Sequence, residues 1–107
     1  MLDSALFSRT LTWPDAQCFA RQQVLAHLAT PAGPITVPLT VCEVAESPAA
    51  PGAHQFRISF QGPADAFLTQ GTYRMQHPQL GDYAIFMTPV ARRPEGFVYE
   101  ACFSHVG

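Results

Sequence analysis

The fold is decided by residues 54–103, which read HQFRISFQGPADAFLTQGTYRMQHPQLGDYAIFMTPVARRPEGFVYEACF. Four segments that begin in this stretch alternate apolar and polar residues, namely 55–61, 72–76, 82–91 and 97–104. An alternation with a period of two is typical of β-strands that bury one face. Because glycine and proline separate the segments, we expect antiparallel strands joined by turns.

The first and last of these segments are the most regular. Their apolar positions are Phe56, Ile58, Phe60, Phe97, Tyr99, Ala101 and Phe103. Tyr73 falls on the equivalent face of the second segment. We therefore expect Phe60, Tyr73 and Tyr99 to share one aromatic core on facing strands.

The preceding part of the chain predicts a hairpin. Its arms are residues 24–29 and 35–42, joined by the loop 30–34, and Ile35, Val37, Leu39 and Val41 form the apolar face of the second arm. Pro38 cannot donate a ladder hydrogen bond, so this strand should lie at an edge or be irregular there. Residues 46–53 follow as a loop of small residues, which we expect to be mobile.

A short helix is predicted over residues 13–22. A hydroxyl residue, a proline and an acid come together at Thr12, Pro14 and Asp15, which is the chemistry of a helix N-terminus. On a helical wheel an apolar stripe holds Trp13, Ala16, Ala20 and Val24, and the opposite side holds Asp15, Cys18 and Gln22. Before this helix, residues 1–10 are expected to form a polar arm, with Leu2, Leu6 and Phe7 available to dock on the core.

These elements predict a mostly β protein, with about six antiparallel strands in a small sandwich or a partly open barrel and one short N-terminal helix. With 107 residues, the chain has the size of one cooperative domain, so we expect residues 1–107 to form a single β domain.

Composition argues against several classes of partner. The net charge is −2 and the six basic residues, all arginine, are spread along the chain, so no basic stripe for nucleic acid is expected.

The sequence shows neither a signal peptide nor a run of about 20 apolar residues, so we expect synthesis in the cytoplasm and no transmembrane segment. The cysteines Cys18, Cys42 and Cys102 form an odd set without Cys-x-x-Cys spacing, which favours a reducing compartment.

No catalytic, cofactor-binding or metal-binding residues are predicted. The histidines lack the short spacing that positions two metal ligands. Cys42 and Cys102 fall on the outer strand face, but nothing in the sequence supplies a base to activate them, so we expect inert thiols. His77 is expected to bond the backbone of its own turn. Glu100 is expected to pair across strands with Arg57 or Arg74.

One strand departs from the alternation. In residues 83–90, Tyr83, Ile85 and Met87 make one apolar face, and Ala84, Phe86 and Val90 make a second. Something must therefore cover Phe86 from the outside. Three candidates remain open, which are the helix at 13–22, a plug formed by Phe67 and Leu68, and another protein chain. The third makes Ala84, Phe86 and Val90 a possible interface for self-association or for a partner.

The second half of the chain resembles a known family. Its motifs are Phe-x-Gly-Pro at residues 60–63, Gln-Gly-x-Tyr at 70–73, His-Pro-x-Leu-Gly at 77–81, Ile-Phe-x-x-Pro-Val at 85–90 and Tyr-Glu-Ala-x-Phe at 99–103. This pattern is similar to a family of small bacterial domains of unknown function. The resemblance implies an association with proteins like phage tail collars or short tail fibres, and it carries over no catalytic residues.

Together these features predict a non-enzymatic structural or accessory protein that acts through protein contacts, in a phage-tail-like or surface-fibre system. The alternative is a small-ligand-binding β barrel, in which aromatic residues line a cavity. A hydrolytic or thiol enzyme ranks third. A filled interior favours the first function, and a pocket of several hundred cubic ångströms favours the second.

Overall fold

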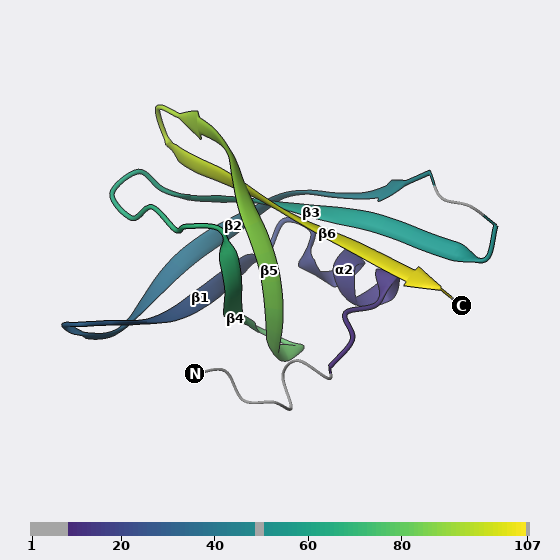
Figure 1. The fold of residues 1–107 in the computed structure, drawn as a ribbon, viewed down its shortest axis with the longest axis horizontal. Coiled ribbons are helices and arrows are strands. Elements are labelled where there is room, and N and C mark those ends of the chain that lie inside the picture. The colour runs from purple at the N-terminus through teal and green to yellow at the C-terminus, as the bar shows by residue number, and fades with distance from the viewer. Residues whose placement is uncertain (1–8, 49–50, 107) are drawn as a thin grey trace.

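A computed structural model gives the architecture, and it describes residues 9–48 and 51–106. Leu2, Leu6 and Phe7 of the expected arm lie outside the described residues. The elements are α2 (Trp13–Phe19), β1 (Gln23–Thr30), β2 (Gly33–Ser47), β3 (Ala53–Pro63), β4 (Gly71–His77), β5 (Gly81–Arg93) and β6 (Gly96–Val106) (Figure 1).

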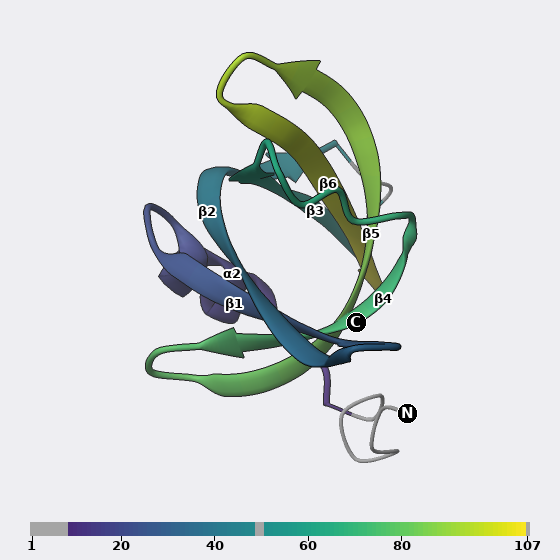
Figure 2. The ribbon, with the colours of Figure 1, turned by 90° about the vertical axis from the view of Figure 1, so that its left-hand side faces the viewer.

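The six strands form one closed antiparallel barrel in the order β1-β2-β3-β6-β5-β4 (Figure 2). The prediction of about six antiparallel strands and one short helix is confirmed. The arrangement is a barrel rather than a sandwich, and the barrel is closed rather than partly open. Closure comes from β1 and β4, which share only three pairs: Leu25 with Gln76, Ala26 with Met75, and His27 with Arg74. By contrast, β3 and β6 share eleven.

Two bulges bend the strands of the barrel. Cys42 is the extra residue where β2 pairs with β3, and Val90 is the extra residue where β5 pairs with β6. A bulge kinks its strand and increases the local twist, which helps a sheet to curl into a barrel. The glycine of the Phe-x-Gly-Pro motif, Gly62, packs closely against the barrel core. A Cβ at this position would lie 2.9 Å from Cδ2 of Leu39 and 3.0 Å from Cε2 of Tyr99.

The β1–β2 hairpin is longer than predicted. Its ladder runs from Gln23 with Thr40 to Thr30 with Gly33, and β2 continues to Ser47, which takes over part of the loop expected from residue 46. The hairpin tip projects from the barrel (Figure 1). Ile35 lies on this projection and is 44% exposed, so its prediction as a core-face residue is wrong.

Pro38 occupies the local edge that its chemistry requires. It is exposed and pairs with Leu25 of β1, while the ladder between β2 and β3 begins only at Thr40. The missing N–H of Pro38 therefore interrupts no pairing with β3. The predicted edge position is confirmed for this segment of β2, although β2 as a whole is an inner strand of the barrel.

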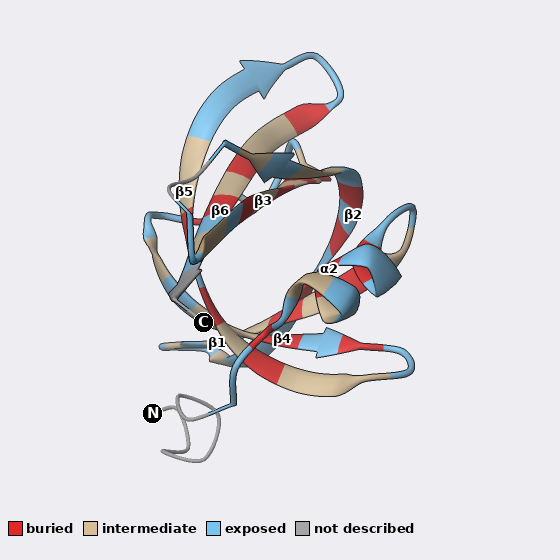
Figure 3. Ribbon diagram, turned by 90° about the vertical axis from the view of Figure 1, so that its right-hand side faces the viewer, coloured by how far each residue is buried: buried red, intermediate tan, exposed pale blue. Residues whose placement is uncertain are grey.

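Helix α2 covers one end of the barrel and is shorter than predicted (Figure 3). It ends at Phe19 rather than Gln22, because Arg21 adopts a left-handed φ of 64° and Val24 already belongs to β1. The ring of Trp13 lies 5.5 Å from that of Phe56 on β3. Ala16 and Phe19 are buried beneath the helix.

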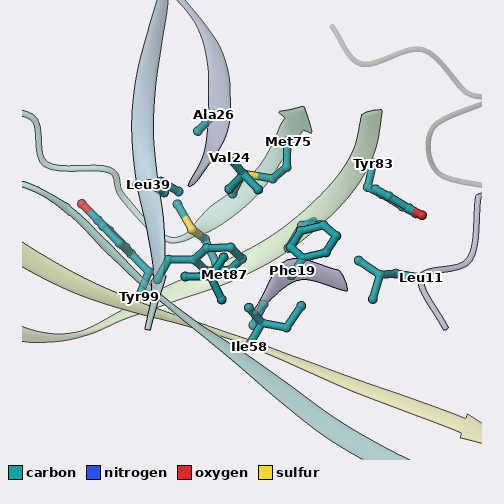
Figure 4. Close-up of a cluster of buried hydrophobic side chains, with 14 of the residues drawn as sticks. Leu11, Phe19, Val24, Ala26, Leu39, Ile58, Met75, Tyr83, Met87 and Tyr99 are labelled. Atoms are coloured by element: carbon teal, nitrogen blue, oxygen red, sulfur yellow. The ribbon is translucent and has the colours of Figure 1, made fainter. Parts of the chain in front are cut away.

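The barrel interior is filled by side chains. Figure 4 shows Phe19 from α2 among Leu11, Ile58 and Tyr83. Phe60 and Tyr99 are fully buried as predicted, whereas Tyr73 is only half-buried at the edge of the core. The buried apolar residues are Leu11, Ala16, Phe19, Val24, Ala26, Val37, Leu39, Val41, Phe56, Ile58, Phe60, Leu68, Met75, Tyr83, Ile85, Met87, Tyr99 and Ala101.

The connection between β3 and β4 contributes one residue to this core. Leu68 is buried, and its N–H donates to the hydroxyl of Tyr99 at 2.9 Å. Its neighbour Phe67 is 53% exposed and packs edge-on against Phe97, with ring centroids 4.8 Å apart. The predicted plug therefore consists of Leu68 alone.

Candidate functional site

The outer face of β5 exposes large apolar side chains. Tyr83, Ile85 and Met87 point into the barrel and are buried, as the alternation predicts. On the other face Ala84 is half-buried, and Phe86 and Val90 are each 53% exposed. We call Ala84, Phe86 and Val90 the β5 face. Val90 belongs to the last part of β5, residues 90–93, which is exposed (Figure 3).

Neither of the two intramolecular covers considered for Phe86 lies over it. Helix α2 packs toward Phe56 through Trp13 and toward Tyr83 through Phe19, at the end of the barrel. Leu68 is inserted beside Tyr99, and Phe67 packs on Phe97. The expectation that the helix or the plug shields Phe86 is therefore wrong, and more than half of its surface remains accessible.

A groove lies beside this face, where β1 and β4 separate. Beyond the last closing pair, His27 with Arg74, β1 continues along β2 to Thr30 and β4 begins at Gly71 along β5. The space between them measures about 540 Å³. It is lined by His27, Leu28, Ala29, Pro34, Ile35, Thr36, Thr72, Tyr73 and Arg74. We call this space the seam groove.

The titratable side chains of the seam groove are engaged with their neighbours. Nε2 of His27 donates to Oε1 of Gln76 at 2.9 Å, and Nδ1 lies 3.3 Å from the hydroxyl of Thr36. A guanidinium N–H of Arg74 donates to Oδ2 of Asp82 at 2.8 Å. These contacts leave apolar side chains as the main feature that a ligand or partner could recognise in the groove.

Glu100 pairs with neither of the two arginines considered for it, because Arg74 bonds Asp82 and Arg57 bonds a different glutamate. The guanidinium of Arg57 bonds Glu43 at 3.0 Å, while Glu100 accepts a weak hydrogen bond from the thiol of Cys102 at 3.5 Å. The predicted pairing of Glu100 with Arg57 or Arg74 is therefore wrong. The β2–β3 register explains the difference, because it places Arg57 opposite Ala45, which is two residues from Glu43 on the same strand.

The cysteines are exposed, and two of them, Cys42 and Cys102, are poorly activated. Cys18, Cys42 and Cys102 are all free thiols at the surface. Partial burial raises the pKa of Cys42 above its usual value, despite the opposing charge of Arg93. Burial and then Glu100 raise the pKa of Cys102. A raised pKa lowers the fraction of the reactive thiolate at neutral pH, so neither Cys42 nor Cys102 has the setting of a nucleophile.

His77 is a structural residue of the β4–β5 turn. Its Nδ1 accepts from the backbone N–H groups of Gln79 and Leu80, both at 3.0 Å, so the predicted bonding to its own turn is confirmed. A further contact has no local signal in the sequence: Nε2 donates to the carbonyl of Cys18 in α2 at 3.1 Å. His77 is buried and joins the helix to the barrel.

The described residues contain no cluster of three or more His, Cys, Asp or Glu side chains suited to a metal ion. Within that same part of the chain, none of the helices is long and apolar enough to cross a membrane.

Comparison with known families matches residues 11–103 to a domain of unknown function, DUF6916. The chain belongs to the DUF6916 family. No curated protein and no solved structure matches this DUF6916 chain. The match covers the helix, all of β1 to β5 and most of β6, so both the β5 face and the seam groove lie within the family domain.

Sequence reasoning located the β5 face of this DUF6916 domain but missed the seam groove. The second apolar face of residues 83–90 was visible as a break in alternation. The groove depends on where β1 and β4 stop pairing, and 40 residues of chain separate the end of β1 at Thr30 from the start of β4 at Gly71. The one local signal is the Thr30–Gly33 turn, which sets how far the hairpin extends.

Proposed function

We propose that this domain is a non-enzymatic structural or accessory protein that acts through protein contacts, with Ala84, Phe86 and Val90 as its contact face. The observation that carries the proposal is the 53% exposure of both Phe86 and Val90 on one strand. Large aromatic side chains that remain accessible are typical anchors of protein interfaces.

The surface chemistry supports this proposal. Charged residues make up 13% of the chain and the net charge is −2, so electrostatic repulsion between approaching proteins is weak. The raised pKa of Cys42 and of Cys102 argues against thiol chemistry. By the resemblance of its motifs to a bacterial family, we place this function in a phage-tail-like or surface-fibre system.

A second candidate is a small-ligand-binding barrel. The seam groove favours it, because about 540 Å³ lies within the range of about 300–1,000 Å³ found for ligand pockets. The packed core argues against a ligand in the interior, so a ligand would bind at the seam groove. We rank this function second because His27 and Arg74 of the groove already bond neighbouring side chains, namely those of Gln76 and Asp82.

The test uses two matched phenylalanines. Phe86 and Phe67 have the same exposed fraction but lie on different surfaces, so Phe67→Ser controls for the loss of an exposed aromatic ring. The tagged wild type and the two variants are used to capture the purified products of the neighbouring genes. We expect the wild type and Phe67→Ser to retain a partner and Phe86→Ser to lose it, with all three melting at similar temperatures.

Two results would overturn the proposal. One is equal capture by all three proteins, which would show that the β5 face is not the contact surface. The other is a native protein that is purified from its source as a lone monomer and that retains none of the neighbouring products.

A further inference from the structure

The seam groove and Phe86 are neighbours on the outside of the barrel. Thr72 of β4 lines the groove, and Thr72 is the cross-strand partner of Phe86 on β5. Adjacent strands lie about 4.8 Å apart, so an apolar projection stands one strand away from an apolar hollow. Strand β4 separates the two.

The groove suits an uncharged apolar occupant. Leu28, Pro34 and Ile35 contribute apolar side chains to its lining, and Ile35 is 44% exposed. Its three titratable side chains each bond a neighbour within the described part of the chain. His27 bonds Gln76 and Thr36, and Arg74 bonds Asp82. The hydroxyl of Tyr73 donates to the carbonyl of Thr69. An ionic ligand would compete with these bonds, whereas an aromatic ring would not.

We infer that a second copy of this chain occupies the groove, with Phe86 of each protomer inserted into the seam groove of the other. This inference rests on the proposed function, because it uses the same contact face. A two-fold axis that runs along β4, between the projection and the hollow, brings each Phe86 over the opposite groove. Such an interface is isologous and closes as a dimer.

The charges near this axis permit the approach. Arg74 projects from β4, where two copies would meet, but it forms an ion pair with Asp82 on the same protomer. The β4 surfaces therefore meet as neutral pairs rather than as two unpaired cations. The net charge of −2 per chain adds little repulsion.

Light scattering coupled to size exclusion tests the dimer across micromolar concentrations. We expect the wild type to have twice the chain mass of 11.7 kDa. Phe86→Asp removes the projection, and Ala29→Arg fills the groove from an exposed position with a long side chain. Each variant should raise the dimer dissociation constant at least about a hundredfold, since two buried aromatic contacts are lost. Phe67→Asp and Ala29→Ser should leave it unchanged.

Mixing the two disruptive variants gives the decisive result. Phe86→Asp keeps an intact groove and Ala29→Arg keeps an intact Phe86, so one native contact is restored in a mixed pair. In the other half of the interface of this mixed pair, the carboxylate introduced by Phe86→Asp on one protomer faces the guanidinium introduced by Ala29→Arg on the other. We expect a heterodimer from the mixture, although each variant alone is monomeric and melts near the wild-type temperature.

Other outcomes overturn the inference. A monomeric wild type would exclude the dimer, and Phe86-dependent capture of a different protein would then still support the proposed function. A dimer that is lost in Phe86→Asp but unchanged in Ala29→Arg would show that Phe86 packs elsewhere on the second copy, outside the groove.

Discussion

At the scale of single residues, two tyrosines, Tyr83 and Tyr99, are buried in the apolar core of the barrel. Burial raises the pKa of Tyr83, with a smaller contribution from Asp15, and the charge of Arg9 above its ring acts in the opposite direction. Burial also raises the pKa of Tyr99, although the N–H of Leu68 favours the phenolate. Both phenols therefore lose their protons at a higher pH in the folded protein than in the unfolded chain.

This difference predicts alkaline instability. In the unfolded chain tyrosine loses its proton near pH 10, before the folded state does. The free energy of unfolding should be unaffected by Tyr83 and Tyr99 below about pH 10 and should fall as the pH rises toward the folded-state values. Urea midpoints between about pH 8 and about pH 11 measure this fall. Tyr83→Phe should make it shallower, and an equally steep fall in that variant would contradict the assignment.

Alternation identified most core residues because a strand that buries one face must repeat every second side chain. It failed where the depth of burial depends on position along the barrel. Ile35 has the same parity as the buried Val37, yet it lies on the projecting hairpin tip. Tyr73 has core parity but borders the seam groove and donates its hydroxyl proton to the carbonyl of Thr69 at 2.6 Å.

At the scale of elements, α2 depends on its cap. The helix has seven residues, and isolated helices shorter than about 12–15 residues are marginal in water. Thr12 and Asp15 form a reciprocal capping box: the N–H of Asp15 donates to Thr12 at 3.3 Å, and the N–H of Thr12 donates to Asp15 at 3.2 Å. The sequence signal at residues 12–15 correctly predicted where the helix begins. The helical wheel extended the helix to residue 22, whereas it ends at Phe19.

The capping box gives a prediction for one hydroxyl. Thr12→Ala should lower the free energy of unfolding by about 1 kcal/mol, the usual effect of a lost N-cap. The melting temperature should fall by about 4–8 °C, as expected for a domain of about this size. Thr12→Ser keeps an acceptor and should recover most of the loss. Thr10→Ala, in the exposed segment before the helix, is the matched control. An equal fall in the control would assign the effect to the segment rather than to the cap.

At the scale of the whole molecule, closure of the barrel could not be predicted from the chain. The strands and their order along the sequence follow from local patterns, but the curvature depends on the bulges at Cys42 and Val90, which the apolar–polar alternation does not predict. The pairing of β1 with β4 joins distant residues through only three pairs. Sequence patterns therefore left a sandwich and a partly open barrel as alternatives, and they gave no indication of a groove.

The uneven ladders predict where the barrel opens first. The β1–β4 seam is held by three pairs and the β3–β6 ladder by eleven, so the free energy needed to open the seam should be much smaller. Native-state hydrogen exchange on the Phe86→Asp variant should show fast exchange for the amides that close the seam at residues 25–27 and 74–76. The amides of Ile58 and Ala101, paired within the longer ladder, should be the slow reference. In the wild type, seam protection should rise with protein concentration, because the proposed dimer covers this region. Equal protection of the seam and the β3–β6 ladder in the variant would show that the barrel opens as a single unit.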